Sequence, residues 1–186
     1  MAGHLIVACW IIFMLYWFVS ARSVKATVER QSLASELAYR LPILAGWLLL
    51  VLDRLPGPLD QAVLPHRAVI KLSGVAICVL GLLVAVWARK TLADNWSSTV
   101  VFKQNHELVE RGPYRFARHP IYTGILLMFL GTVIAANRAA GFAALVFCFV
   151  GFWIKLKQEE KLMLRHFSNE YPAYQARVKA LVPYVL

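Results

Sequence analysis

The side chains best suited to chemistry gather in one short stretch, from His106 to Gly124. Arginine and tyrosine side chains donate hydrogen bonds to anionic groups, and Gly112-Pro113 and His119-Pro120 are pairs that redirect the backbone. An apolar run follows directly. We interpret the stretch as the edge of an active site, with these donors: Arg111, Arg115, Arg118, Tyr114 and Tyr122.

A second candidate is the acidic pair Glu159-Glu160, just past the end of another apolar run. Paired carboxylates there are suited to an ammonium group or to a basic partner from the first stretch. The same pair also fits an ordinary solvated helix face, balanced by Lys157 and Lys161. Arg118 and His119 have an equally plain alternative as anchors of a membrane span. Spacing alone leaves both choices open.

The elements that carry these residues are membrane helices. The chain has 186 residues, is 60% hydrophobic and has a mean hydropathy of +0.60, which exceeds the apolar content of ordinary soluble domains. We expect an all-α integral membrane protein forming one domain, with three spans in residues 1–88 and a catalytic half in residues 89–186. The last two of five apolar runs have only about 16 residues each, against roughly 20 for a full span, and we expect a hairpin turning at Asn137-Arg138. The predicted spans are Leu5–Ser20, Tyr39–Leu55, Ala68–Ala88, Ile121–Ala136 and Ala139–Ile154.

The positive charges are distributed unevenly around these spans. With alternating segments, sixteen of the twenty Lys and Arg residues fall on one side, and cytoplasmic loops are the ones that collect such residues. The N-terminus is therefore expected outside and the C-terminus in the cytoplasm. The net charge of +10 is assigned to contact with anionic membrane lipids, and no nucleic-acid partner is expected.

The remaining polar sequence is expected to form a cytoplasmic cap and a C-terminal helix that together enclose a pocket. That helix should leave the membrane, break before Pro172 and continue as a short amphipathic tail. Three isolated cysteines predict neither a disulfide nor a metal site. Four tryptophans are interpreted as packing or membrane-interface residues rather than site residues: Trp10, Trp17, Trp47 and Trp87.

The ordered motifs of the C-terminal half resemble the isoprenylcysteine carboxyl methyltransferase and phospholipid methyltransferase superfamily. The resemblance spans Asn95 to Pro183 and leaves the first two spans without a recognised motif. It is carried by Arg118-His119-Pro120-Ile121-Tyr122-Thr123-Gly124 with Ile125-Leu126, by Trp153, Glu159-Glu160, Leu164, Tyr171, Tyr174 and Val182-Pro183, and upstream by Asn95-Trp96-Ser97, His106-Glu107-Leu108-Val109 and Gly112-Pro113-Tyr114.

The resemblance implies a five-span enzyme that takes S-adenosylmethionine from the cytoplasm and a lipophilic acceptor from the bilayer. The acceptor would be a lipophilic small molecule or a lipidated peptide, in the first place an isoprenylcysteine-like or other lipid-linked carboxylate. Arg118, Arg177 and Glu160 would be catalytic, with the two arginines orienting the acceptor carboxylate. The residues implied for cofactor binding are His106, Leu108, Val109, Gly112, Pro113, Tyr114, His119, Tyr122, Gly124, Glu159 and Glu160.

The reaction would be an in-line methyl transfer. A carboxylate is already nucleophilic at neutral pH, so the enzyme has mainly to align it and exclude water. An ethanolamine headgroup would first have to lose a proton, which Glu159 or Glu160 could accept. This phospholipid N-methylation is the alternative we keep open.

Two further alternatives belong to other classes. Sterol-type reductases that use NADPH share an Arg-His-Pro-x-Tyr segment but usually continue with an aromatic-Gly-Glu step, whereas this chain reads Tyr122-Thr123-Gly124-Ile125. A non-enzymatic lipid-binding membrane protein would explain the positive charge but not the order of the motifs. The short chain resembles a bacterial or archaeal member, which predicts the prokaryotic inner membrane, and the oligomeric state is left open.

Overall fold

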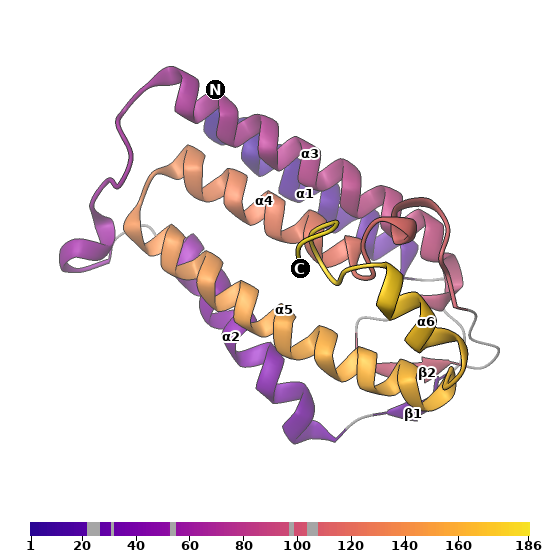
Figure 1. Cartoon of the computed structure of the whole chain (residues 1–186). Coiled ribbons are helices and arrows are strands. Elements are labelled where there is room, and N and C mark those ends of the chain that lie inside the picture. Colours follow the sequence, from indigo (N-terminus) through magenta and orange to yellow (C-terminus); the bar gives the residue numbers. More distant parts are fainter. Residues whose placement is uncertain (22–26, 31, 53–54, 97–98, 104–107) are drawn as a thin grey trace.

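Five long helices make up most of the computed structural model, which describes residues 1–21, 27–30, 32–52, 55–96, 99–103 and 108–186. Figure 1 shows α1, α3 and α4 side by side, with α2 and α5 forming a second pair below them. The long helices are α1 (Ala2–Ser20), α2 (Leu33–Val51), α3 (Ala68–Leu92), α4 (Pro120–Ala136) and α5 (Ala139–His166).

Four of these helices, α1, α2, α3 and α5, are long and apolar enough to cross a bilayer, and α4 is a shorter apolar helix of 17 residues. Large apolar side chains such as Leu15, Phe18 and Leu83 are exposed on the outside of the bundle. In water such a surface would be unusual, but in a bilayer it faces lipid tails. The prediction of an all-α membrane fold with five apolar helices is confirmed.

Several predicted boundaries need correction: α1 begins at Ala2 rather than Leu5, α2 ends at Val51 rather than Leu55, and α3 continues to Leu92 rather than Ala88. Helix α2 begins at Leu33 rather than Tyr39, because the Ser32 hydroxyl caps it by accepting a hydrogen bond from the Ser35 amide at 3.3 Å. Helix α5 does not end at Ile154 but runs on to His166, so it carries the acidic pair out of the apolar layer. The break before Pro172 is confirmed, since the next helix, α6 (Glu170–Arg177), begins after a turn.

The hairpin between α4 and α5 turns where it was predicted, at Asn137. This residue has a left-handed backbone with φ of 54°, a conformation that asparagine tolerates better than most residues. Its side chain accepts hydrogen bonds from the Val63 and Leu64 amides at 3.2 and 2.7 Å and donates one to the Leu64 carbonyl at 2.7 Å. The turn therefore also holds the segment that precedes α3.

Glycines bring α3 and α4 into close antiparallel contact. A Cβ atom on Gly81 would lie 2.5 Å from the Gly124 carbonyl oxygen, and one on Gly74 would lie 2.6 Å from the Gly131 carbonyl oxygen. Helices α2 and α5 make a similar approach at Gly46 and Gly151. Small residues at helix contacts are typical of membrane bundles, where van der Waals packing replaces the hydrophobic effect between helices.

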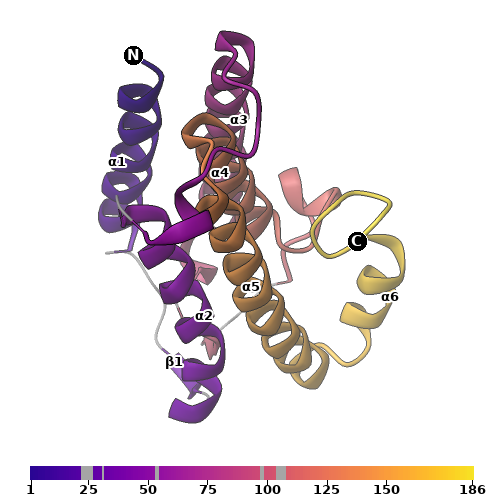
Figure 2. The same ribbon diagram turned by 90° about the vertical axis from the view of Figure 1, so that its left-hand side faces the viewer.

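The connections lie at two opposite ends of the bundle (Figures 1 and 2). One end carries the 3-10 helix η1 (Gly57–Asp60) and the Asn137 turn. The other carries α6, the C-terminal segment, the 3-10 helices η2 (Ala93–Asn95) and η3 (Gly112–Arg115), and two short strands, β1 (Thr27–Arg30) and β2 (Val101–Lys103). The strands pair antiparallel, with Glu29 opposite Phe102, and were not predicted. They connect the segment after α1 to the predicted cap.

Candidate active site

The start of α4 is held in place by the C-terminal segment. The Arg118 amide donates to the Lys179 carbonyl at 2.8 Å, and the His119 amide donates to the Ala180 carbonyl at 2.9 Å. One turn later the Thr123 hydroxyl donates to the Leu181 carbonyl at 2.7 Å. The Arg-His-Pro-x-Tyr segment thus has a backbone fixed on one side by residues some 60 positions later in the chain.

Arg118 forms a buried ion pair with Glu160 on α5. Its Nε donates to Oε1 of Glu160 at 2.9 Å, and the two side chains are only 7% and 4% exposed. The Nη1 group donates to the main-chain carbonyls of Val178 and Gln175. Each of the three guanidinium nitrogens therefore donates to a group within the protein, and the residue ties α4, α5 and the C-terminal segment together.

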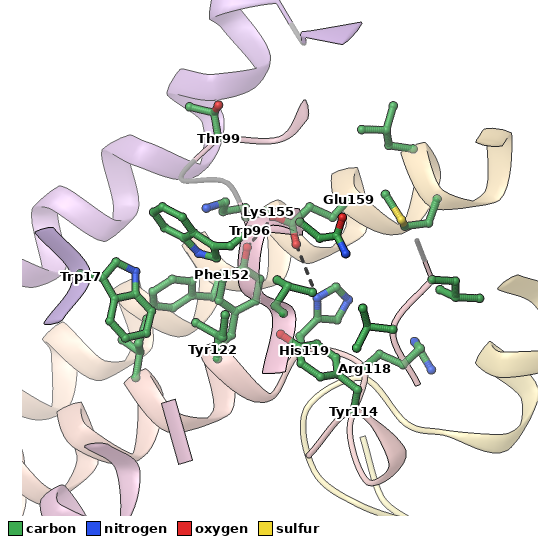
Figure 3. A pocket seen from close by; sticks show the side chains of 18 of the residues that line it. Trp17, Trp96, Thr99, Tyr114, Arg118, His119, Tyr122, Phe152, Lys155 and Glu159 are labelled. Atoms are coloured by element: carbon green, nitrogen blue, oxygen red, sulfur yellow. Dashed lines mark hydrogen bonds and ion pairs between the residues drawn. The ribbon is translucent and has the colours of Figure 1, made fainter. Parts of the chain in front are cut away.

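Glu159 is bound by the two aromatic side chains that follow Arg118. The Tyr122 hydroxyl donates to Oε1 of Glu159 at 2.6 Å, and the His119 Nδ1 lies 3.5 Å from Oε2. The His119 and Tyr122 rings stack with centroids 5.6 Å apart, and Tyr122 stacks in turn on Phe152 at 5.0 Å. Since α4 and α5 leave their turn as a hairpin, these contacts join their far ends, and Figure 3 shows the His119–Glu159 contact.

Burial alone would lower the pKa of His119, because it disfavours the charged imidazolium. The two neighbouring carboxylates, Glu159 and Glu160, act in the opposite direction and prevail, so the pKa of His119 is raised above its ordinary value of 6.5. His119 thus favours its protonated form, which faces both carboxylates.

These residues lie at one end of a cavity of about 550 Å³, a size typical of small-molecule sites. The cavity continues from this polar end into the helix bundle between aromatic and aliphatic side chains. Helices α1, α2, α4, α5 and α6 contribute to its wall, as do the last residue of α3 and the segment between α3 and α4. The residues that line it include Phe13, Trp17, Ile43, Trp47, Trp96, Leu108, Val109, Tyr114, Arg118, His119, Tyr122, Ile125, Phe152, Lys155, Glu159 and Tyr174.

The cavity also has a cationic side chain on its wall, Lys155. This residue lies one helical turn before Glu159, is 8% exposed, and places Nζ 5.4 Å from the ring centroids of both Tyr39 and Tyr122. Figure 3 shows Lys155 and Glu159 projecting from α5 toward the same space. The cavity therefore offers both signs of charge beside aromatic rings.

Comparison with known proteins gives a match for the part of the chain that carries this polar end. A model of the phospholipid methyltransferase family matches residues 69–170, more than half of the 186 residues. The chain belongs to the phospholipid methyltransferase family. The match covers all of α4 and α5 and all but the first residue of α3, whereas α1, α2 and all but the first residue of α6 lie outside it.

Among the curated relatives whose sequences match this chain are isoprenylcysteine methyltransferases. Protein-S-isoprenylcysteine O-methyltransferase B of Arabidopsis thaliana is 29% identical over 115 residues, which is 60% of this chain and 58% of the relative. The human protein-S-isoprenylcysteine O-methyltransferase is 26% identical over 152 residues, 80% of this chain and 52% of the relative. The chain thus spans about half the length of the curated relatives it matches.

The fold also has a counterpart among solved structures. The eukaryotic intramembrane Ras methyltransferase ICMT, isoprenylcysteine carboxyl methyltransferase, superposes with a TM-score of 0.58 at 21% identity, over 79% of this chain and 52% of that one. This likeness confirms the membrane-helix architecture. Together with its apolar helices, it identifies this family member as an integral membrane protein.

Seven of the site residues predicted from the sequence line this cavity. They come from the segment before α4, from α4 itself and from α5, as expected for a pocket closed by a cap and a C-terminal helix. They are Leu108, Val109, Tyr114, Arg118, His119, Tyr122 and Glu159. Glu160 lies behind this wall, bound to Arg118 and 3% exposed, so the interpretation of the acidic pair as a solvated helix face is wrong.

The other predicted residues lie elsewhere. Gly112, with φ of +60°, and Pro113 form η3, where a Cβ on Gly112 would lie 3.0 Å from the Thr91 hydroxyl. Gly124 is buried in the α3–α4 contact. Arg177 points outward on α6 and pairs with Glu110 at 2.8 Å, with 66% of its side chain exposed. His106 lies outside the described residues.

Sequence reasoning missed the aromatic wall. Trp17 and Trp47 were interpreted as packing or interface residues, but both line the cavity, as does Trp96. Trp17 and Trp96 meet edge to face with centroids 6.3 Å apart, and both are labelled in Figure 3. Helices α1 and α2 carried no motif, so only a three-dimensional arrangement could reveal these contributions. Lys155 was missed because a lysine at the end of a span is ordinarily an anchor.

Proposed function

We propose that this protein is a methyltransferase that uses S-adenosylmethionine to methylate a carboxylate on a lipophilic acceptor of the isoprenylcysteine type. The proposal rests on one cavity whose two ends differ in polarity. Its polar end presents Glu159, bound to Tyr122 and His119, and its inner end is built from aromatic and aliphatic side chains. Family membership and the names of the relatives support the same reaction class.

The residues at the polar end fit the cofactor chemically. A carboxylate suits the ammonium group of the methionine moiety, and Glu159 has one oxygen atom held by Tyr122 at 2.6 Å. Aromatic faces suit an adenine ring and a sulfonium cation, and the Tyr122, Tyr114 and Trp96 side chains line the same space. When bound, S-adenosylmethionine would supply the methyl group on its positively charged sulfur.

The protein's own contribution would be positional. Since an ionised carboxylate acceptor needs no base, the chain has to orient it and keep water away. The aromatic wall would exclude water. The Arg118–Glu160 pair would hold α4 and α5 at the distance that lets His119, Tyr122 and Glu159 meet.

Phospholipid amine N-methylation remains the second candidate, because Glu159 lies on the cavity wall. A carboxylate there could accept the proton that an ammonium acceptor must lose before it attacks. Lys155 on the same wall favours the anionic acceptor over this cationic one.

The test uses purified protein in detergent, methyl-labelled S-adenosylmethionine, and two acceptors, an S-farnesylcysteine derivative and phosphatidylethanolamine. The proposal predicts base-labile methyl ester on the farnesylcysteine and no label on the phospholipid. Label on the phospholipid alone would establish the second candidate. Absence of label from both, with intact fold, would contradict each of them.

We also propose that the end bearing the site faces the cytoplasm, where the cofactor is available. When the apolar runs of the sequence are taken as alternating spans, sixteen of the twenty Lys and Arg residues fall on the side of the Arg118-His119 segment, and cytoplasmic loops collect such residues. A single cysteine introduced at Asp60, in a background in which the three native cysteines are replaced, should react with an impermeant maleimide added outside the cell. A cysteine introduced at Lys179 should react only after the membrane is opened, and the reverse pattern would overturn the orientation.

A further inference from the structure

Three aromatic rings from three helices meet beneath the cavity. Trp10 of α1, Trp47 of α2 and Phe129 of α4 have centroids 4.7, 4.9 and 5.2 Å apart, each pair edge to face. Aromatic pairs prefer this arrangement. Trp47 lines the cavity, whereas Phe129 has no exposed surface at all.

One hydrogen bond fixes this aromatic cluster in position. Trp10 Nε1 donates to the Thr132 hydroxyl at 3.0 Å, and that hydroxyl donates to the Met128 carbonyl one turn earlier on α4. Trp10 is also held by Phe13, at a centroid distance of 5.7 Å. The indole therefore has a defined orientation and cannot swing aside without losing a hydrogen bond inside the bundle.

The cluster lies one to two helical turns deeper than the polar end. On α4, Tyr122 contacts Glu159, Ile125 lines the cavity further in, and Phe129 packs against Trp47 of the cavity wall. From Tyr122 to Phe129 there are seven residues, or roughly 10 Å of helix rise. On α5 the same interval separates Glu159 from Phe152. An apolar chain that lies in the cavity with its head group near the polar end would thus reach Trp47, and the rings packed behind it, after a set length.

We propose that Trp10, Trp47 and Phe129 form a floor that limits the length of the acceptor's apolar chain, and so select among isoprenoid or alkyl acceptors by length. This inference rests on the proposed function, because it assigns the inner end of the cavity to the acceptor. The occupant is a hydrocarbon chain, since the inner wall is formed by Phe13, Ile43, Ile125 and Phe152. A polar occupant would lose its hydration there without replacement.

The test is the dependence of binding and turnover on chain length in a series of S-prenyl-, S-geranyl-, S-farnesyl- and S-geranylgeranyl-cysteine carboxylates. Binding is measured directly by competition with a fluorescent member of the series, so that the result does not depend on methyl transfer. Phe129→Leu puts a somewhat smaller side chain in the floor and should deepen the cavity. Ile125→Phe puts a larger side chain in the wall and should make the cavity shallower. Phe147→Leu is the matched control, because Phe147 lies on α5, 44% exposed and outside the cavity.

If the floor limits chain length, the two variants should shift the preferred chain length in opposite directions. Phe129→Leu should improve the longer chains relative to the shorter ones by roughly tenfold, and Ile125→Phe should do the reverse by a similar factor. A mere loss of stability cannot produce shifts in both directions. Unchanged length profiles in both variants, or a wild-type profile without a length limit, would overturn the inference.

Failure of the proposed function would look different. In that case no member of the series would be methylated, while the binding profile would still report whether the floor exists. A length limit in binding that moves with Phe129 and Ile125 supports the floor even then. Binding in which affinity does not depend on the apolar chain at all would contradict the floor.

Discussion

Arg118 and Glu160 lie 42 positions apart in the chain, yet their side chains form a buried ion pair with Nε and Oε1 2.9 Å apart. The pair connects the segment just before α4 to the C-terminal half of α5. Removing one member of a buried pair leaves an uncompensated charge, which costs about 3–5 kcal/mol. The relationship gives Arg118 a structural role beside the orienting role predicted from the sequence.

We therefore expect Arg118→Met to destabilise the protein by about 3 kcal/mol or more, as measured by denaturation in detergent micelles. Arg138→Met is the control, because its pair with Asp60 is 22% and 47% exposed and exposed pairs contribute about 0–1 kcal/mol. An Arg118→Met protein of normal stability that binds cofactor but does not turn over acceptor would instead assign Arg118 to the acceptor.

Glu159→Gln removes the charge at the polar end but keeps the shape of the side chain. The loss of a charge-assisted contact should weaken binding of S-adenosylhomocysteine by roughly tenfold to a hundredfold, as measured by titration calorimetry. Asp60→Asn makes the same chemical change at the opposite end of the bundle, where Asp60 pairs with Arg138. Equal affinities in the two variants would exclude Glu159 from the cofactor site.

The raised pKa of His119 gives the fold a dependence on pH. A group whose pKa is higher in the folded state than in the unfolded state stabilises the fold fully below the unfolded value, here about 6.5. This contribution is lost as the pH rises through the raised folded value, where His119 gives up its proton beside Glu159 and Glu160. We expect the denaturation midpoint to fall over that interval and the fall to be reduced in His119→Gln.

His66→Gln is the control for the pH series, since His66 is exposed at the other end of the bundle. It should retain the wild-type dependence. A His119→Gln profile that is parallel to the wild-type profile would show that the imidazolium does not contribute to stability. Each series should be recorded at constant ionic strength, because exposed charges are screened by salt.

A substitution at Gly124 separates its role in helix packing from its predicted role in cofactor binding. A Cβ at this position would lie 2.6 Å from the Ala85 amide nitrogen and 2.7 Å from the Gly81 carbonyl oxygen, so Gly124→Ala should destabilise by about 1–3 kcal/mol. The cofactor affinity of the protein that remains folded should stay unchanged. Gly3→Ala, which meets nothing within 4 Å, is the control. A Gly124→Ala protein that has normal stability but has lost its affinity for the cofactor would instead place Gly124 in the cofactor site.

Much of the fold follows from simple sequence physics. The five apolar runs correspond to five helices, and the turn at Asn137 was expected because the run is interrupted there by Asn137-Arg138. The end of α5 was harder to predict, since hydropathy falls at Lys155 while helical hydrogen bonding continues to His166. The β1–β2 pair depends on two segments about 70 residues apart, and no local pattern specifies such a partner.

The site shows the same division between local and long-range information. Motif order pointed to Tyr114, His119, Tyr122 and Glu159, which share one cavity wall. Local spacing could not show that Glu160 lies behind that wall, because neighbouring helical positions differ by about 100° in direction. The aromatic contributions of Trp17 and Trp47 were also out of reach, since they depend on how α1 and α2 pack beside α4. The domain assignment stays a prediction.

If the polar end of the cavity binds a sulfur nucleoside, S-adenosylhomocysteine should raise the thermal denaturation midpoint of the purified protein, which is measured with NADPH in parallel. A ligand that binds only the folded state raises the midpoint in proportion to the logarithm of its concentration above Kd. Binding of the sulfur nucleoside at this end predicts a rise with S-adenosylhomocysteine, no rise with NADPH, and a smaller rise in Glu159→Gln than in Asp60→Asn. A rise with NADPH alone, or no rise with either ligand at saturating concentrations, would contradict it.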